Sequence, residues 1–185
     1  MDNGASSYRR FLNGERDALT EIIKEYKDGL IFFLCGFCGN ISCAEDMAQE
    51  TFLKLYVKKP KFNGKSSFKT WLYSIGRNTA VDFIRRDSRM QTVSADESAE
   101  YADFCSNPEF TYFDSEKKQA VHMAMLRLKP EYRQILWLVY FEEMSSGEAS
   151  KILKKSANST AVLLHRAKNL LKSELLKEGF TYEDL

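Results

Sequence analysis

Several features that define other classes of protein are scarce in this sequence. Its 185 residues include only three prolines, nine glycines and four cysteines, which are too few cysteines for a disulfide scaffold. Alternating apolar and polar runs are absent, so β-strands have little support. The longest apolar stretch, residues 30–38, is shorter than the roughly 20 residues that cross a bilayer. The polar N-terminus does not resemble a signal peptide, and we expect a soluble, cytoplasmic protein.

The net charge of +1 hides a strong segregation of charge along the chain. Residues 1–92 carry a net charge of +4, residues 93–115 carry −6, and residues 116–185 carry +3. This layout predicts two basic domains that contact a polyanion, joined by a linker that avoids it. We therefore place the domains at 1–92 and 116–185, with an acidic linker at 93–115.

Apolar residues spaced three and four apart predict helices in the first domain. The expected ranges are 15–37, 42–56 and 66–89. Gly39 should stop the first helix, and a capping box between Ser42 and Glu45 should begin the second. Gly76 is expected to interrupt the third helix, because glycine is a poor helix former.

The second domain shows the same periodicity. Its expected helices cover 115–128, 131–142, 148–153 and 159–177. Ser145 and Glu148 form a capping-box pattern. A short helix, a polar turn and a longer basic helix are typical of a helix-turn-helix, although a purely structural helical hairpin has the same pattern. The predicted fold class is all-α, with two small helical domains and a helix-turn-helix in the second.

The segment from Lys54 to Arg89 combines cations with aromatic rings. It holds ten basic residues and only two acids, interleaved with six aromatic side chains. Cations neutralise phosphates, and flat side chains stack on bases that have left a duplex. This composition indicates a surface for single-stranded nucleic acid. A solvated basic face over an ordinary aromatic core explains the composition equally well.

Five segments carry a resemblance to a known family. Residues 44–56 (AEDMAQETFLKLY) resemble the polymerase-binding helix of extracytoplasmic-function sigma factors, and residues 68–86 (FKTWLYSIGRNTAVDFIRR) look like the promoter-melting segment of that group. Residues 128–133, 142–153 and 165–168 are similar to its C-terminal domain. The resemblance implies a factor that directs RNA polymerase to specific promoters, melts the minus-ten element and reads the minus-thirty-five element. It implies no catalysis, cofactor, metal or small-molecule substrate.

The same resemblance assigns three groups of contact residues. Contacts to the clamp helices of the largest subunit of core RNA polymerase are expected from Asp46, Gln49, Glu50, Leu53 and Tyr56. Contacts to the single-stranded minus-ten element are expected from Lys65, Trp71, Tyr73, Arg77, Asn78, Arg85 and Arg86, with a base-reading turn around Gly76. Contacts to the minus-thirty-five duplex are expected from Ser156, Asn158, Ser159, Thr160, Val162, Arg166 and Lys168. Family members are often held inactive by an anti-sigma protein, which is a further expected partner.

The third group departs from the family pattern. Residues 159–164 (STAVLL) are small or apolar where the family carries a basic or polar run, and base readout normally uses Arg, Lys, Asn or Gln. Ala161, Val162 and Leu163 would contact thymine methyl groups. Equally, this domain binds DNA weakly or needs another protein.

The acidic linker and the isolated histidines allow fewer conclusions. In the family this linker threads the polymerase cleft, where an acidic run mimics nucleic acid, but a flexible polar tether has the same composition. His122 and His165 have no nucleophile nearby in sequence that would indicate catalysis.

Two rival functions remain open. A helix-turn-helix repressor or activator needs only the C-terminal half, and it leaves residues 44–86 unexplained. A thiol oxidoreductase would use Cys35 and Cys38, which form a CxxC motif. That motif lies at the end of an apolar helix rather than after a strand, which favours buried structural thiols. Cys43 nearby leaves a redox-sensing role open.

Overall fold

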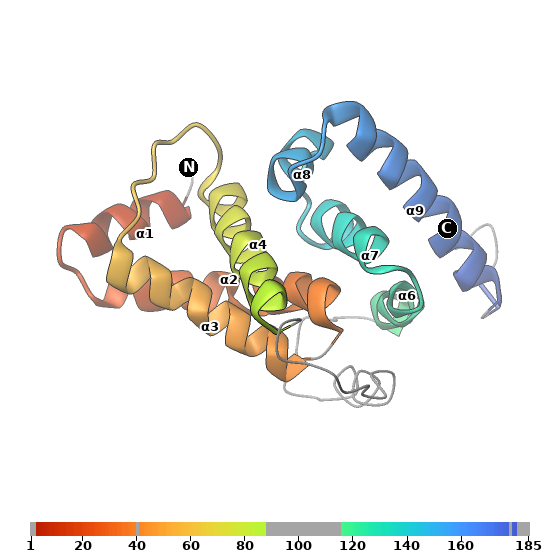
Figure 1. The fold of residues 1–185 in the computed structure, drawn as a ribbon, viewed down its shortest axis with the longest axis horizontal. Coiled ribbons are helices and arrows are strands. Elements are labelled where there is room, and N and C mark those ends of the chain that lie inside the picture. The colour runs from red at the N-terminus through yellow and green to blue at the C-terminus, as the bar shows by residue number, and fades with distance from the viewer. Residues whose placement is uncertain (1–2, 40, 88–115, 178, 181–185) are drawn as a thin grey trace.

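The computed structural model describes residues 3–39, 41–87, 116–177 and 179–180 (Figure 1), and all regular secondary structure in these ranges is helical. The N-terminal lobe consists of α1 (Asn3–Leu12), α2 (Asp17–Cys38), α3 (Ile41–Lys58) and α4 (Phe68–Asp87). The C-terminal lobe consists of α6 (Glu116–Leu126), α7 (Pro130–Leu136), the π-helix η1 (Trp137–Phe141), α8 (Ser146–Leu153) and α9 (Ala157–Lys177). The predicted linker, 93–115, lies outside the described residues.

Helix α2 is the centre of the N-terminal lobe and packs against α1, α3 and α4. All eight residues from Gly29 to Gly36 are buried, because this half of the helix has neighbours on every side. The helix ends at Cys38 as predicted, since Gly39 adopts a left-handed conformation (φ 71°) and its N–H donates to the carbonyl of Cys35.

Three details of the N-terminal lobe differ from the sequence prediction. Helix α1 was not predicted, and Tyr8 fixes it in place by burying its ring and donating a hydrogen bond to the Pro60 carbonyl at 2.8 Å. The capping box at Ser42 is wrong, because α3 already begins at Ile41. The break at Gly76 is also wrong. Helix α4 continues through it, and a Cβ at this position would lie 2.8 Å from Leu30 Cδ1 of α2.

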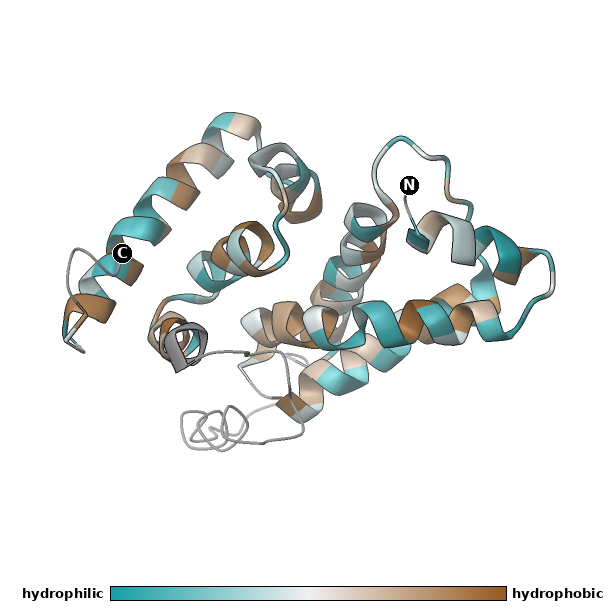
Figure 2. Cartoon of the chain, turned by 180° about the vertical axis from the view of Figure 1, so that it is seen from behind, coloured by the Kyte–Doolittle hydropathy of each residue, from teal (hydrophilic) through white to brown (hydrophobic). Residues whose placement is uncertain are grey.

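The C-terminal lobe contains the expected pair of helices. The capping box before α8 is confirmed: the Glu148 N–H donates to Ser145 Oγ, and the Ser145 N–H donates to Glu148 Oε2. Lys154 then takes a left-handed conformation (φ 54°) that turns the chain into α9. Hydrophilic and apolar bands alternate along α9 (Figure 2), as expected for a helix with one buried face.

The predicted helix 131–142 changes its geometry halfway. Its first part is α7, and its second part is the π-helix η1, in which the Glu142 N–H donates to the Trp137 carbonyl five residues earlier. A π-turn brings residues five apart onto one side of the helix. Here it places the carboxylate of Glu142 within 3.1 Å of the indole nitrogen of Trp137.

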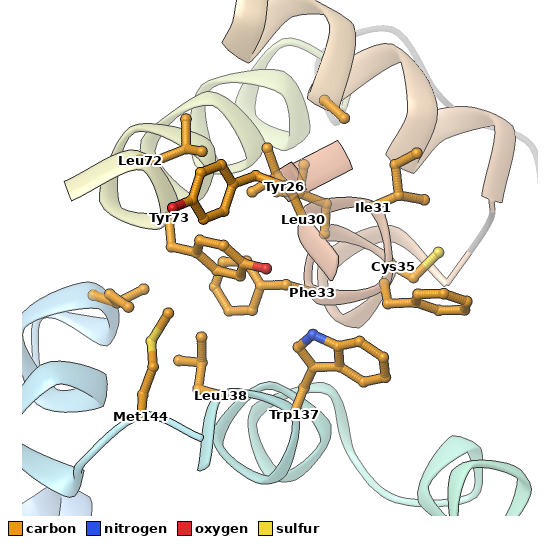
Figure 3. Packing of buried hydrophobic residues seen from close by; sticks show 14 of the residues in the cluster. Tyr26, Leu30, Ile31, Phe33, Cys35, Leu72, Tyr73, Trp137, Leu138 and Met144 are labelled. Atoms are coloured by element: carbon orange, nitrogen blue, oxygen red, sulfur yellow. The ribbon is translucent and has the colours of Figure 1, made fainter. Parts of the chain in front are cut away.

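The two lobes share one hydrophobic core. Trp137, Leu138 and Met144 of the C-terminal lobe face Phe33 and Tyr73 of the N-terminal lobe (Figure 3). Helix α4 packs on α8, and α2 packs on α7 and η1. The lobes are therefore in close contact along a seam that includes polar groups from both sides.

Candidate functional site

A groove of about 780 Å³ lies between α2 and α3. All five residues predicted to bind the polymerase line it, namely Asp46, Gln49, Glu50, Leu53 and Tyr56. Two of them leave apolar surface open to solvent, since Leu53 is 57% exposed and Tyr56 is 47% exposed. Large apolar side chains with such exposure, rimmed by polar groups, are typical of a protein-binding surface.

Sequence reasoning missed the opposite wall of this groove. That wall is contributed by α2 through Leu19, Ile23, Lys27 and Ile31, which recur at four-residue spacing. This spacing was visible in the sequence, but it indicated only the buried side of an amphipathic helix. The groove needs two helices, so no single motif could identify it.

Three charged residues connect this groove with the end of α4. Glu50 accepts an ion pair from Lys54 at 3.1 Å and another from Arg86 at 3.0 Å. Burial opposes ionisation of the Glu50 carboxyl, but the hydrogen bonds from Lys54 and Arg86 outweigh it and lower its pKa. Lys54 also donates to Thr79 Oγ1 of α4 at 2.9 Å. The predicted protein-binding and nucleic-acid-binding surfaces therefore meet at Glu50.

The predicted minus-ten residues separate into exposed and buried groups. Lys65, Asn78, Arg85 and Arg86 are exposed, and Arg77 is half-buried. Trp71, Asn78 and Arg85 are seven residues apart, so they follow one face of α4. Tyr73 lies on the opposite side of the helix with 0% exposure, and its ring packs 5.4 Å from that of Phe33. In this conformation Tyr73 cannot contact DNA.

Trp71 sits at the edge of an aromatic cluster. Its ring centroid lies 5.2 Å from Tyr8, 5.2 Å from Phe62 and 5.4 Å from Phe68. The side chain is half-buried rather than enclosed. Both readings of the aromatic residues are therefore present in one segment, because Phe68 belongs to the core while Trp71 reaches the surface.

The base-reading turn expected around Gly76 is not a turn. Gly76, Arg77 and Asn78 are three consecutive helical residues in the middle of α4. Asn78 nevertheless projects into solvent on the same face as Arg85. A carboxamide at this point offers both a donor and an acceptor to a polar edge of a ligand.

The helix-turn-helix presents a mostly uncharged face on α9. Ser156, Asn158, Ser159, Val162, Arg166 and Lys168 are all exposed, as a contact surface requires. Ser156 caps the helix by accepting the Ser159 N–H at 3.1 Å. Thr160 is the exception among the predicted residues, since it is 0% exposed and donates to the Ser156 carbonyl. Its side chain supports the helix start and does not reach this surface.

Two further residues belong to the same face of α9. His165 and Asn169 are exposed and hydrogen-bond each other at 3.2 Å. Together with Asn158 and Val162 they follow the helical spacing of four, three and four residues. That spacing could have identified them in the sequence. Lys168 lies apart from this line, with its ammonium 5.4 Å from the ring centroid of Tyr140.

The cysteines do not form a redox or metal centre in the described part of the chain. Cys35 is buried in α2, while Cys38 and Cys43 are half-buried thiols, and no disulfide joins them. Among described residues, no group of three or more His, Cys, Asp or Glu side chains is placed to hold a metal ion. None of the described helices combines the length and hydropathy needed to cross a membrane.

Family models match both lobes in chain order. The model described as Sigma-70 region 2 matches residues 22–90, and the model described as Sigma-70, region 4 matches residues 118–171. The RNA polymerase sigma factor YlaC of Bacillus subtilis (strain 168) is 30% identical over 164 residues, covering 88% of this chain and 94% of that protein. The ECF RNA polymerase sigma factor SigW of the same organism is 29% identical over 170 residues, covering 88% and 91%.

Two solved structures share the fold. The sigma factor RpoE from Bartonella quintana, solved in complex with the anti-sigma factor NepR, superposes with a TM-score of 0.63 at 21% identity and covers 84% of this chain and 95% of that chain. CnrH, solved in complex with the cytosolic domain of CnrY, superposes with a TM-score of 0.60 at 20% identity and covers 94% of both chains. At this level of identity the likeness establishes the architecture of helices and lobes.

Proposed function

Because this chain belongs to the extracytoplasmic-function group of RNA polymerase sigma factors, we propose that the α2–α3 groove docks on core polymerase and that α4 and α9 contact promoter DNA. As a sigma factor, the protein directs RNA polymerase to promoters to initiate transcription. The observation that carries the residue-level proposal is that five residues assigned to polymerase binding line a single groove.

The chemistry of the groove specifies what docks there. Leu53 and Tyr56 supply apolar surface, while Glu45, Asp46 and Glu50 give one wall an excess of carboxylates. A helical partner with apolar side chains and flanking cations would satisfy both, because apolar contact provides affinity and charge complementarity sets orientation. The clamp helices of the largest polymerase subunit are the partner that we assign to this groove.

Helix α4 is the surface that we assign to the minus-ten element. Arg85 and Arg86 stand exposed in its last turn, and Lys65 is exposed in the loop before it. These cations would hold phosphates, while Asn78 would hydrogen-bond the edge of an unpaired base. Trp71 lies on the same face and would stack at the boundary of the melted region. Melting would be driven by binding energy, since holding a flipped base offsets a few kcal/mol of unstacking.

Helix α9 is the surface that we assign to the minus-thirty-five element. A recognition helix enters the major groove with its first turns, and here those turns present Asn158, Ser159 and Val162. Asn158 would hydrogen-bond a base and Val162 would contact a thymine methyl group. Arg166 is the cation on this side of the helix. With so few charges, we expect affinity for the isolated duplex to be low and to depend on the polymerase.

A protein inhibitor is a further proposed partner. The two solved structures with this fold each contain a sigma factor together with a second protein, named as an anti-sigma factor in one of them. We extend this arrangement to the present chain on the basis of shared fold and family. We likewise place the protein in the cytoplasm, where bacterial polymerase acts.

Run-off transcription tests the proposed function directly. The purified protein is added to core RNA polymerase with fragments of genomic DNA, and transcript start sites are mapped. Defined start sites should appear only when the protein is present. A variant with Leu53→Ser and Tyr56→Ser should lose them, because it removes the apolar surface of the groove.

The matched control carries Leu12→Ser on α1, where a leucine of similar exposure (41%) lies outside the groove. It should retain the start sites of the unmodified protein. If the unmodified protein gives core polymerase no selectivity in the absence of any inhibitor, the assignment is wrong. Loss of selectivity in both variants would instead reject the groove as the docking site.

A further inference from the structure

Hydrogen bonds cross the seam between the lobes at three places along α2 and α4. The indole N–H of Trp137 donates to the Gly29 carbonyl at 3.1 Å. The Gln134 side-chain amide donates to the Gly36 carbonyl at 3.0 Å. On α4, Thr70 donates to Glu148 Oε1 at 2.9 Å. Directional contacts of this kind fix one relative position of the lobes, whereas apolar packing alone tolerates sliding.

A buried ion pair lies in the middle of this seam. The side chain of Glu142 in the C-terminal lobe is 3% exposed, and its carboxylate lies 2.6 Å from the ammonium of Lys69 in the N-terminal lobe. The same ammonium donates to the Glu142 carbonyl at 3.0 Å, and the carboxylate also accepts from Trp137. Removing one partner of such a pair leaves a buried charge uncompensated, which strongly disfavours the buried arrangement.

The seam is also shaped for close approach at Gly36. A Cβ at this position would lie 2.9 Å from Gln134 Cγ, and the other neighbouring atoms are also backbone atoms of Gln134. Every neighbour that a methyl group would meet within 4 Å therefore belongs to the C-terminal lobe. A larger residue at this position would push the lobes apart without disturbing the N-terminal lobe.

Helix α2 uses different sides for the seam and for the groove. Gly29, Phe32 and Gly36 face the C-terminal lobe, whereas Ile23 and Lys27 line the α2–α3 groove. The groove therefore remains accessible while the lobes are in contact.

We propose that the Glu142–Lys69 contact and the surrounding seam hold the free protein in a closed, autoinhibited conformation that must open when the polymerase holoenzyme forms. This inference rests on the proposed function, because it concerns the separation of the two DNA-contacting surfaces. Core polymerase binds through the exposed groove, and the free energy of that binding separates the lobes.

The distances require this opening. The side-chain contact between Thr70 and Glu148, followed along α4 to Asn78 and along α8 and the turn to Asn158, limits the separation of the two surfaces to roughly 45 Å. The two promoter elements are centred about 25 base pairs apart, which is on the order of 80 Å of B-form DNA. The closed conformation cannot contact both elements at once.

Weakening the seam should therefore increase the apparent affinity for core polymerase. A ligand that binds only the open state has an apparent dissociation constant raised by the inverse of the open fraction. A mutation that increases the open fraction removes part of this penalty without touching the groove. The effect is opposite in sign to that of ordinary destabilising mutations, which lower affinity or leave it unchanged.

The test uses the full-length chain with two independent variants, Gly36→Ala and Glu142→Gln, and Gly147→Ala as the matched control. Gly147 also lies in a helix, but a Cβ there would meet only Ser145 Oγ at 3.9 Å. Small-angle X-ray scattering measures the radius of gyration of each free protein, circular dichroism measures its helix content, and fluorescence titration measures its affinity for core polymerase.

Both seam variants should keep the helix content of the unmodified protein while the radius of gyration increases by about 3 Å or more. Their affinity for core polymerase should increase by at least about threefold, and the control should match the unmodified protein in every measurement. Equal radii in the unmodified protein and both variants would overturn the proposal, as would opening without a gain in affinity. If the protein lacks sigma activity altogether, the proposed function fails, whereas the change in radius still reports on the seam.

Discussion

The buried imidazole of His122 should make the stability of this protein depend on pH in a mildly acidic range. His122 is 3% exposed and is surrounded by the rings of Phe32, Trp137 and Phe141, with centroids 5.4, 5.7 and 6.3 Å away. Burial, and then the nearby positive charge of Arg133, lower its pKa from 6.5 to about 4. The native state therefore holds this side chain neutral.

The sign of the effect follows from the number of protons that each state binds. Between pH 6.5 and about 4 the unfolded chain protonates His122 while the folded chain does not, so stability decreases as the pH falls through this window. It is fully retained above the window and changes no further below it. With these two pKa values, the loss between pH 7.5 and pH 5 is about 2 kcal/mol, as an order of magnitude.

Urea denaturation at pH 7.5, 6 and 5 measures this dependence. In the variant His122→Leu the loss on acidification should shrink by about 2 kcal/mol relative to the unmodified protein. The absolute stability of the variant is not the criterion, because a substitution in the core alters it for other reasons. The slope against pH isolates the titrating group.

The chain supplies its own control, because it contains two histidines and the second, His165, is exposed. The variant His165→Leu should retain the full pH dependence. If His122→Leu keeps the slope of the unmodified protein, the imidazole is not held neutral by burial and the reasoning is refuted.

Three other changes give clear expectations. Asn78→Ala should reduce permanganate reactivity of thymines in the transcription bubble, with polymerase binding unchanged; full reactivity would remove Asn78 from the minus-ten surface. Val162→Ser should lower transcription from promoters with an intact minus-thirty-five element by a few-fold, since one apolar base contact is lost. Promoters that lack the element are the control, and an equal decrease on both would argue against base contact. Gly76→Ala should lower the free energy of unfolding by about 1–3 kcal/mol in urea denaturation, because the new methyl group overpacks the core against Leu30. A stabilised variant would show that helix propensity outweighs this contact.

Periodicity predicted the helices well, because each one buries a stripe of apolar residues. The capping box at Ser145 was also predictable, since its two hydrogen bonds are local. The same reasoning failed at Ser42, where the identical pattern lies inside a helix that begins one residue earlier. It failed again at Gly76, where close packing against α2 requires a glycine within a continuous helix. Local signals do not report which neighbour a helix will meet.

The site residues divide in the same way. The exposed cations and amides of α4 were assigned from a resemblance, and the structure leaves Asn78 and Arg85 accessible on one face. Tyr73 and Thr160 occur in the same motifs but are buried. Burial depends on the opposing lobe or helix, which a motif does not contain. The seam itself left no trace in the sequence, because its partners are separated by 73 residues in the case of Lys69 and Glu142.

The π-turn at Trp137–Phe141 has a consequence for how this chain tolerates deletions. It amounts to one residue more than an α-helix would use over the same length. Deleting Val139 would let the segment relax to ordinary α-geometry, and α8 and α9 would then rotate by about 100° relative to α7. The carboxylate of Glu142 would swing away from the indole, and the recognition helix would point in a new direction. A single deleted codon here would thus re-aim half of the molecule while leaving nearly every residue of its core unchanged.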